Sequence, residues 1–146
     1  MEDIIMTEDE RNYVNLLNDA INRMASNSAN AKSYLVAIVA ALIAIQMPNK
    51  GNAYVILSAL LPTFLFYLMD CYYLSLEKRF RDLQSAFINK DTNEEGQIIA
   101  GLYQFNIYDI KGKLPIKNAI LSWSTTPFYG IVALCVIGFW AIIKFM

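Results

Sequence analysis

The strongest constraint on this chain is a long apolar segment that continues into a charged one without a break. The segment Ala53–Leu76 holds 24 residues, and Asp70 is its only charged side chain. At about 1.5 Å of rise per residue, such a helix exceeds the roughly 30 Å hydrocarbon core of a membrane. The charged sequence that follows, up to residue 89, contains neither Gly nor Pro. The sequence therefore predicts one helix over residues 53–89 that crosses a membrane and extends beyond it.

Two further apolar segments complete an all-α integral membrane fold with three spans. Residues 29–47 form the predicted first span, with Lys32 near its start, and residues 123–145 form the third. Trp123 and Trp140 flank the third span at the depths where aromatic belts meet the interface. The chain is long enough for a single membrane domain.

The positions of Lys and Arg predict how the chain crosses the membrane. With the N-terminus inside, only Lys50 and Lys144 of the 12 Lys and Arg residues lie outside. Because cytoplasmic segments carry the excess of positive charge, we expect an N-in, C-out topology. The expected location is the inner membrane of a bacterium, with the lipid bilayer as the immediate partner.

The first residues have the pattern of an amphipathic helix. Thr7 and Glu10 fit a capping box, and residues 7–25 are predicted as a cytoplasmic helix. Its apolar stripe matches in period a second stripe on the extension of span 2, so we expect the two to pack, although they could serve a neighbouring subunit. The two stripes are Tyr13, Leu16, Leu17, Ala20, Ile21 and Met24, and Met69, Tyr73, Leu76, Phe80, Leu83 and Phe87.

Two polar segments connect these elements. Residues 25–32 are small and polar, and they are interpreted as a joint or as the beginning of the next helix. Residues 90–121 are predicted as a cytoplasmic linker, with Gly101, Gly112 and Pro115 as helix breakers and no regular structure assigned.

Asp70 is the most informative single residue, because carboxylates within spans are costly and usually face a partner or water. Thr63, Tyr67 and Asp70 are spaced i, i+4 and i+7, so they form a polar seam on one helix face. One interpretation is a pore lining or a gate. The other is an anchor near the interface, bonded to a polar residue that precedes span 1. Three such residues are candidates: Arg23, Asn27 and Ser28.

A basic cluster follows the second span. Lys78, Arg79 and Arg81 are consistent with a signal that stops translocation and meets anionic lipid. The alternative is a contact site for an anionic ligand or an acidic partner.

The sequence contains no pattern that predicts catalysis, metal binding or nucleic-acid binding. The chain has no His, its net charge is −1, and it contains no hydrolase or phosphate-loop motif. Cys71 and Cys135 lie in apolar segments and are interpreted as small hydrophobic residues. We therefore expect no enzyme activity, no metal and no cofactor.

Small residues within the spans suggest close contacts between helices, as in small-xxx-small motifs. They are Ala37 and Ala41, Ala40 and Ala44, and Gly130 and Gly138. Three spans are too few to enclose a pore, so a channel would require a homo-oligomer.

Three segments resemble a group of small bacterial membrane proteins. They are RMASNS before the first span, a D-x-Y-Y-L-x-x-E-x-x-F-R-x-L run at the end of the second, and a loosely matched stretch that opens the third. The middle motif is formed by Asp70, Tyr72, Tyr73, Leu74, Glu77, Phe80, Arg81 and Leu83. Ser124, Thr126 and Tyr129 carry the third.

The architecture is also similar to the SLATT class, whose small spans and cytoplasmic helices accompany bacterial anti-phage systems, although a third span exceeds the two-span SLATT core. This likeness implies a pore-forming or membrane-disrupting effector that a cytoplasmic signal or an operon-encoded partner triggers. The alternatives are a non-catalytic membrane anchor for a partner protein and, third, a phage holin.

Overall fold

The computed structural model describes residues 6–46, 53–93, 96–105 and 125–145, and these form an all-α structure. Its elements are α1 (Glu8–Gln46), the 3₁₀ helix η1 (Ala53–Ala59), α2 (Leu60–Ile88) and α4 (Thr126–Phe145). Three helical stretches are long and apolar enough to cross a membrane, namely Glu8–Gln46, Tyr54–Ile88 and Thr126–Phe145. The predicted all-α class with three helices of spanning length is confirmed at this level.

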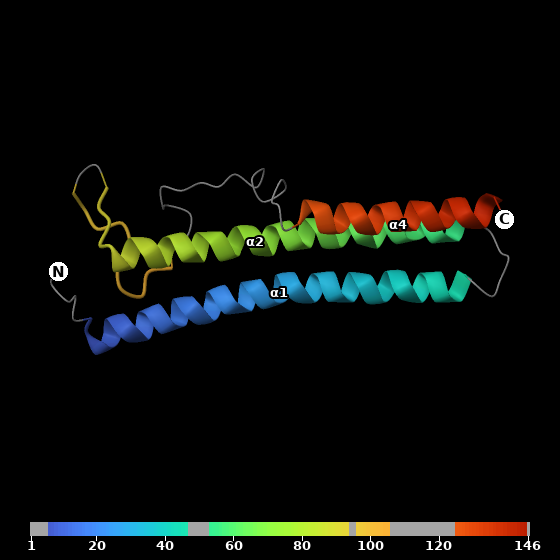
Figure 1. Cartoon of the computed structure of the whole chain (residues 1–146). Coiled ribbons are helices and arrows are strands. Elements are labelled where there is room, and N and C mark those ends of the chain that lie inside the picture. The colour runs from blue at the N-terminus through green and yellow to red at the C-terminus, as the bar shows by residue number, and fades with distance from the viewer. Residues whose placement is uncertain (1–5, 47–52, 94–95, 106–124, 146) are drawn as a thin grey trace.

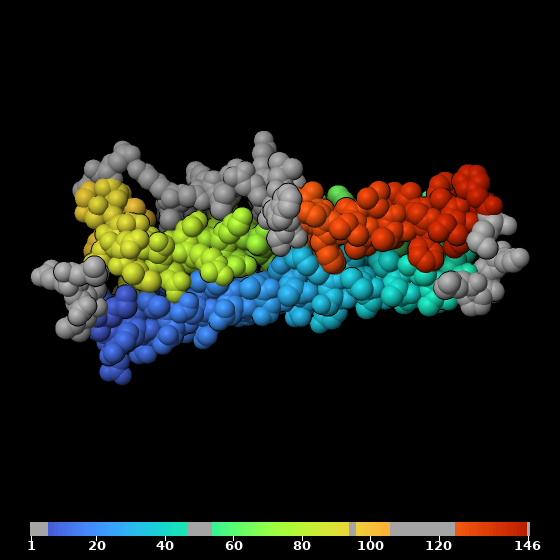
Figure 2. Space-filling model, viewed as in Figure 1, coloured from blue at the N-terminus to red at the C-terminus, as the bar shows by residue number. Residues whose placement is uncertain are grey.

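The molecule is an elongated bundle with two unequal halves. α1 and α2 run antiparallel along nearly their whole length, whereas α4 lies beside only the first part of α2 (Figure 1). The space-filling view shows α4 covering one half of the rod (Figure 2). We call residues 33–46, 53–69 and 126–145 the three-helix half, and residues 8–27 and 71–88 the two-helix half.

α1 is one uninterrupted helix of 39 residues, which differs from the two helices expected over 7–25 and 29–47. The small polar residues between them do not form a joint. No Gly or Pro occurs from Thr7 to Gln46, and alanines supply high helix propensity there. A buried stripe with gaps of three, four or seven residues also runs the length of α1 and keeps one face on α2. It consists of Tyr13, Leu17, Ile21, Ser28, Ala31, Leu35, Val39 and Gln46.

The predicted capping box at the start of α1 is confirmed. The Thr7 backbone N–H donates to Glu10 Oε2 at 2.7 Å, and the Glu10 N–H donates to Thr7 Oγ1 at 3.2 Å. These reciprocal bonds satisfy donors that have no partner within the helix. The hydrogen bond from the Thr7 backbone lowers the pKa of Glu10 below its ordinary value, because it favours the charged carboxylate.

The second long helix begins with a tighter turn than an α-helix. Pro62 lacks an N–H and its ring crowds the carbonyl four residues earlier, which explains the 3₁₀ geometry of η1 before it. Two hydroxyls bond to backbone carbonyls nearby. Ser58 donates to Val55 O at 2.6 Å and Thr63 donates to Ala59 O at 2.7 Å.

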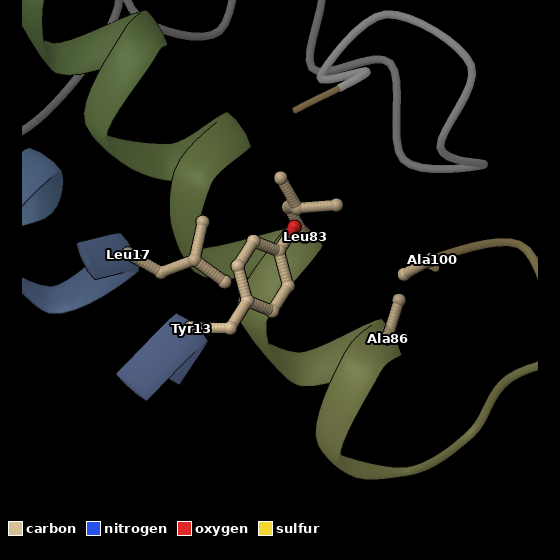
Figure 3. Close-up of a cluster of buried hydrophobic side chains, with 5 residues drawn as sticks. All are labelled: Tyr13, Leu17, Leu83, Ala86 and Ala100. Carbon is tan, nitrogen blue, oxygen red and sulfur yellow. The ribbon is translucent and has the colours of Figure 1, made fainter. Parts of the chain in front are cut away.

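The two-helix half is held by a small core around one tyrosine. Tyr13 and Leu17 from α1 meet Leu83 and Ala86 from α2, and Ala100 closes the cluster (Figure 3). The Tyr13 ring is fully buried, and its hydroxyl donates to the carbonyl of Gln104. Burial raises the pKa of this hydroxyl, because the charged phenolate would lose its solvation.

The segment after α2 folds back over this core. Its turn is stabilised by a bridge between Thr92 and Ile98, with Gly96 at a positive φ of 77°. Tyr103 and Phe105 then pack edge-on against Tyr13, with ring centroids 5.6 and 5.4 Å from it. Residues 96–105 thus form a strap across the end of the two-helix half. The remaining part of the predicted linker, residues 106–121, lies outside the described residues.

We expect Leu83→Ala to destabilise the fold by about 2–5 kcal/mol, because it leaves a cavity in a core where Leu83 is 1% exposed. Thermal unfolding in detergent can be followed by the reaction of buried Cys71 with a thiol dye, in a Cys135→Ser background.

Leu16→Ala is the matched control for that experiment, because Leu16 belongs to the same helix pair but is 47% exposed. Equal losses in the two variants would contradict the core described above.

Candidate functional site

A buried ion pair joins α1 to α2 at the boundary between the two halves. Asp70 is 0% exposed, and its Oδ2 lies 2.6 Å from Lys32 Nζ. Ser28 Oγ donates to Asp70 Oδ1, and Lys32 Nζ donates to Ser28 Oγ at 3.1 Å. The three side chains therefore form a closed triangle. Since the Lys32 side chain keeps 22% exposure, one edge of the triangle reaches the surface.

The first turn of α4 completes the site from a third direction. Tyr129 is 4% exposed, its hydroxyl donates to the carbonyl of Phe66 at 3.2 Å, and it also lies beside the Asp70 carboxylate. Its ring packs edge-on against Tyr67, with centroids 5.4 Å apart. Thr125, fully buried just before α4, interacts with the Cys71 thiol. All three long helices thus converge on Asp70.

These contacts align the three points at which the helices change from polar to apolar. Lys32 precedes the apolar end of α1, Asp70 marks the change on α2, and α4 begins at Thr126 beside them. α4 holds 20 residues and is therefore about 30 Å long, which is the thickness of a hydrocarbon core. At its far end Lys144 Nζ lies 4.9 Å from the centre of the Trp140 ring. The charged groups of Lys32 and Asp70 at one end of α4 and of Lys144 at the other are therefore about one membrane thickness apart.

The structure places the predicted polar seam inside the bundle. Thr63 is 5% exposed and bonds to its own helix, Tyr67 packs on Tyr129, and Asp70 is enclosed by α1 and α4. In this conformation the seam therefore faces helices of the same chain.

Of the three residues considered as partners of Asp70, Ser28 is brought into contact. Arg23 instead lines a pocket near Asp19 and Phe80, more than one helical turn away along α1. Asn27 is half-buried beside Ser28 on α1. The polar side chains around Asp70 in the described part of the chain are those of Ser28, Lys32 and Tyr129.

Sequence reasoning did not pair Lys32 with Asp70, although a signal was present. Lys32 is the one charge in the predicted first span, and Asp70 is the one charge in the apolar part of the second. Lys32 also follows Ser28 by four residues, which places both on one helix face. Two opposite charges in antiparallel neighbouring spans, each close to the same interface, are natural partners.

The basic cluster lies on the part of α2 that follows its apolar part. Arg81 is tied to Glu77 by a contact of 2.9 Å within the helix, and its side chain is 59% exposed. Lys78 and Arg79 are half-buried. An exposed pair of this kind contributes little stability, because water screens it.

The groups at this site form an ion pair and hydrogen bonds that join helices to one another. Among the described residues, no group of three His, Cys, Asp or Glu side chains is arranged to hold a metal ion. Cys71 and Cys135 are not joined in a disulfide, and the first is buried whereas the second is exposed. The ammonium, carboxylate and hydroxyl groups at the boundary are in contact with one another.

Comparison of the chain with family models, curated proteins and solved structures gives no match in any of the three. The functional argument therefore depends on the site itself.

We expect Lys32→Met to destabilise the folded chain by about 3 kcal/mol, because it leaves the Asp70 carboxylate buried without its counter-ion. The measurement is thermal or denaturant unfolding of the detergent-solubilised protein.

The double variant Lys32→Met with Asp70→Asn should recover most of that loss, because it removes both charges and leaves a side chain that can bond to Ser28. If the two single changes simply add in the double variant, the ion pair does not couple α1 to α2 energetically.

Proposed function

We propose that this chain is an oligomeric effector in the inner membrane of a bacterium, part of an anti-phage defence system and able to open or disrupt the membrane. The ion pair between Lys32 and Asp70 holds its resting state. A signal or an operon-encoded partner in the cytoplasm acts on the two-helix half and releases this state. The observation that carries the proposal is the buried pair at the boundary.

The orientation follows from charge. If the two-helix half and the strap lie in the cytoplasm, Lys50 and Lys144 are the only external basic residues of the 12 in the chain. This N-in, C-out arrangement satisfies the positive-inside rule. The amphipathic first part of α1 then packs on the cytoplasmic extension of α2 through the core around Tyr13.

The free energy of the pair favours a role in selecting one packing of the helices over a role in stabilising the fold as a whole. Removing two charges from water costs several kcal/mol per ion, and their attraction does little more than offset this cost. Such a pair adds little net stability, but it favours one arrangement of α1, α2 and α4 strongly over arrangements in which one charge lacks a partner. A change that separates Lys32 from Asp70 therefore favours a different packing of the helices.

The outer surface of the three-helix half supports assembly of several copies. Large apolar side chains face outward on α2, including Leu61 at 65% and Phe64 at 57% exposure. The small residues noted in the sequence are all exposed as well: Ala37, Ala40, Ala41, Ala44, Gly130 and Gly138. An added Cβ at Gly130 or Gly138 would meet no atom within 4 Å. These faces are open to lipid or to helices of other copies.

The likeness to SLATT-type effectors and the D-x-Y-Y-L-x-x-E-x-x-F-R-x-L motif, which includes Asp70, agree with this proposal. The anchor alternative relied on the two apolar stripes as partner surfaces. Tyr13 and Leu17 of one stripe instead pack on Leu83 of the other, so less of that surface is available. A holin is less compatible, since the usual three-span holin has the opposite orientation.

The test is membrane leakage in cells that express the full chain at matched levels. We expect Asp70→Asn to raise the uptake of an impermeant dye and to lower the membrane potential, because it weakens the resting state. A loss of about 1.4 kcal/mol shifts a two-state equilibrium tenfold. Lys144→Met, at the other end of α4, is the matched control and should behave as the wild type.

If dye uptake and membrane potential also stay unchanged during phage infection with the operon neighbours present, the effector role is contradicted. A reporter fused after Met146 tests the orientation separately, and activity of the fusion in the cytoplasm would exclude the N-in, C-out topology.

A further inference from the structure

A groove opens between α1 and α4 next to the ion pair. Its volume is about 350 Å³, and it is lined by Lys32, Ser33 and Val36 of α1 and by Phe128 of α4. α4 packs mainly on η1 and α2, so its first turn leaves this space against α1. The groove has a polar end at Lys32 and an apolar wall at Val36 and Phe128.

The polar end presents positive charge to the outside. A lysine ammonium carries three N–H donors. One of them bonds to Ser28 Oγ, and the ammonium also forms an ion pair with Asp70 Oδ2 at 2.6 Å. Asp70 is fully buried, whereas the Lys32 side chain is 22% exposed and lines the groove, so the groove meets the cation and not the carboxylate. The first turn of α4, which includes Phe128, adds the positive end of a helix dipole.

The groove also lies at a particular depth. It adjoins the boundary at which all three helices change from polar to apolar, which is the depth of lipid headgroups if these helices cross a membrane. Val36, which lines the groove, is 50% exposed, as expected for a surface that lipid covers. A positive donor above an apolar wall at this depth is complementary to a phospholipid, whose phosphate lies directly above its acyl chains.

We propose that this groove binds one anionic phospholipid. The lipid phosphate accepts a hydrogen bond from an N–H of Lys32, and an acyl chain lies along Val36 and Phe128. Lys32 then lies between two anions, the Asp70 carboxylate inside the bundle and the phosphate outside it. The proposal requires only that the three helices cross a membrane, so it stands independently of the effector role.

The test uses the full-length protein, purified in a mild detergent and incubated with micelles containing phosphatidylglycerol or phosphatidylcholine. Retained lipid is counted by native mass spectrometry. We expect the wild type to retain one phosphatidylglycerol per chain, and to prefer it about fivefold over phosphatidylcholine, the preference that one lysine provides at an anionic surface.

Val36→Trp fills the groove from a position that is 50% exposed, so it leaves the ion pair in place and should abolish the retained lipid. Ile45→Trp is the matched control, because Ile45 is 65% exposed near the other end of α1. It should retain lipid as the wild type does. If Val36→Trp does not fold, Ser33→Trp fills the groove from another exposed position.

Three results would overturn the proposal. Retention by the groove-filling variant equal to that of the wild type would place the lipid elsewhere. Equal retention of the two lipids would remove the role of Lys32. Displacement of the lipid by excess inorganic phosphate would identify a general anion site in place of a phospholipid site.

Discussion

The contact between Lys32 and Asp70 determines how the rest of this bundle is arranged. It joins the middle part of α1 to the point on α2 where lipid-compatible sequence gives way to charged sequence. Tyr129 brings the start of α4 to the same level. Three helices that differ in length, 39, 29 and 20 residues, are thereby aligned at one plane. Below that plane the bundle has three helices with apolar outer faces, and above it two helices with polar ones.

The ion pair is tolerated because its two members differ in their exposure to the surroundings. Asp70 is wholly enclosed and paired with the Ser28 hydroxyl and the Lys32 ammonium, whereas the Lys32 side chain keeps 22% exposure. A buried carboxylate without such partners would take up a proton or destabilise the fold. The arrangement therefore combines one fully desolvated charge with one that remains in contact with the outside, and the groove beside Lys32 is the point of that contact.

Much of the fold followed from pattern alone, because length, hydropathy and capping are local properties. Three helices of spanning length and the bonds between Thr7 and Glu10 were predictable in this way. The continuity of α1 was not, since residues 25–32 are individually polar, and what keeps them helical is a buried stripe shared with α2. Ser28 was among the residues considered for Asp70, but Lys32 was not, because a lysine near a span end has an equally good local explanation in snorkelling.

The continuity of α1 gives the molecule a mechanical property. A helix of 39 residues is about 58 Å long, and no soft point separates its two ends. Because the ion pair holds Lys32 in place, α1 would rotate about this residue as a rigid rod. A tilt of about 5° would move each end by roughly 2–3 Å in opposite directions. A rigid-body tilt of α1 that displaces Tyr13 at one end therefore also moves Gln46 at the other.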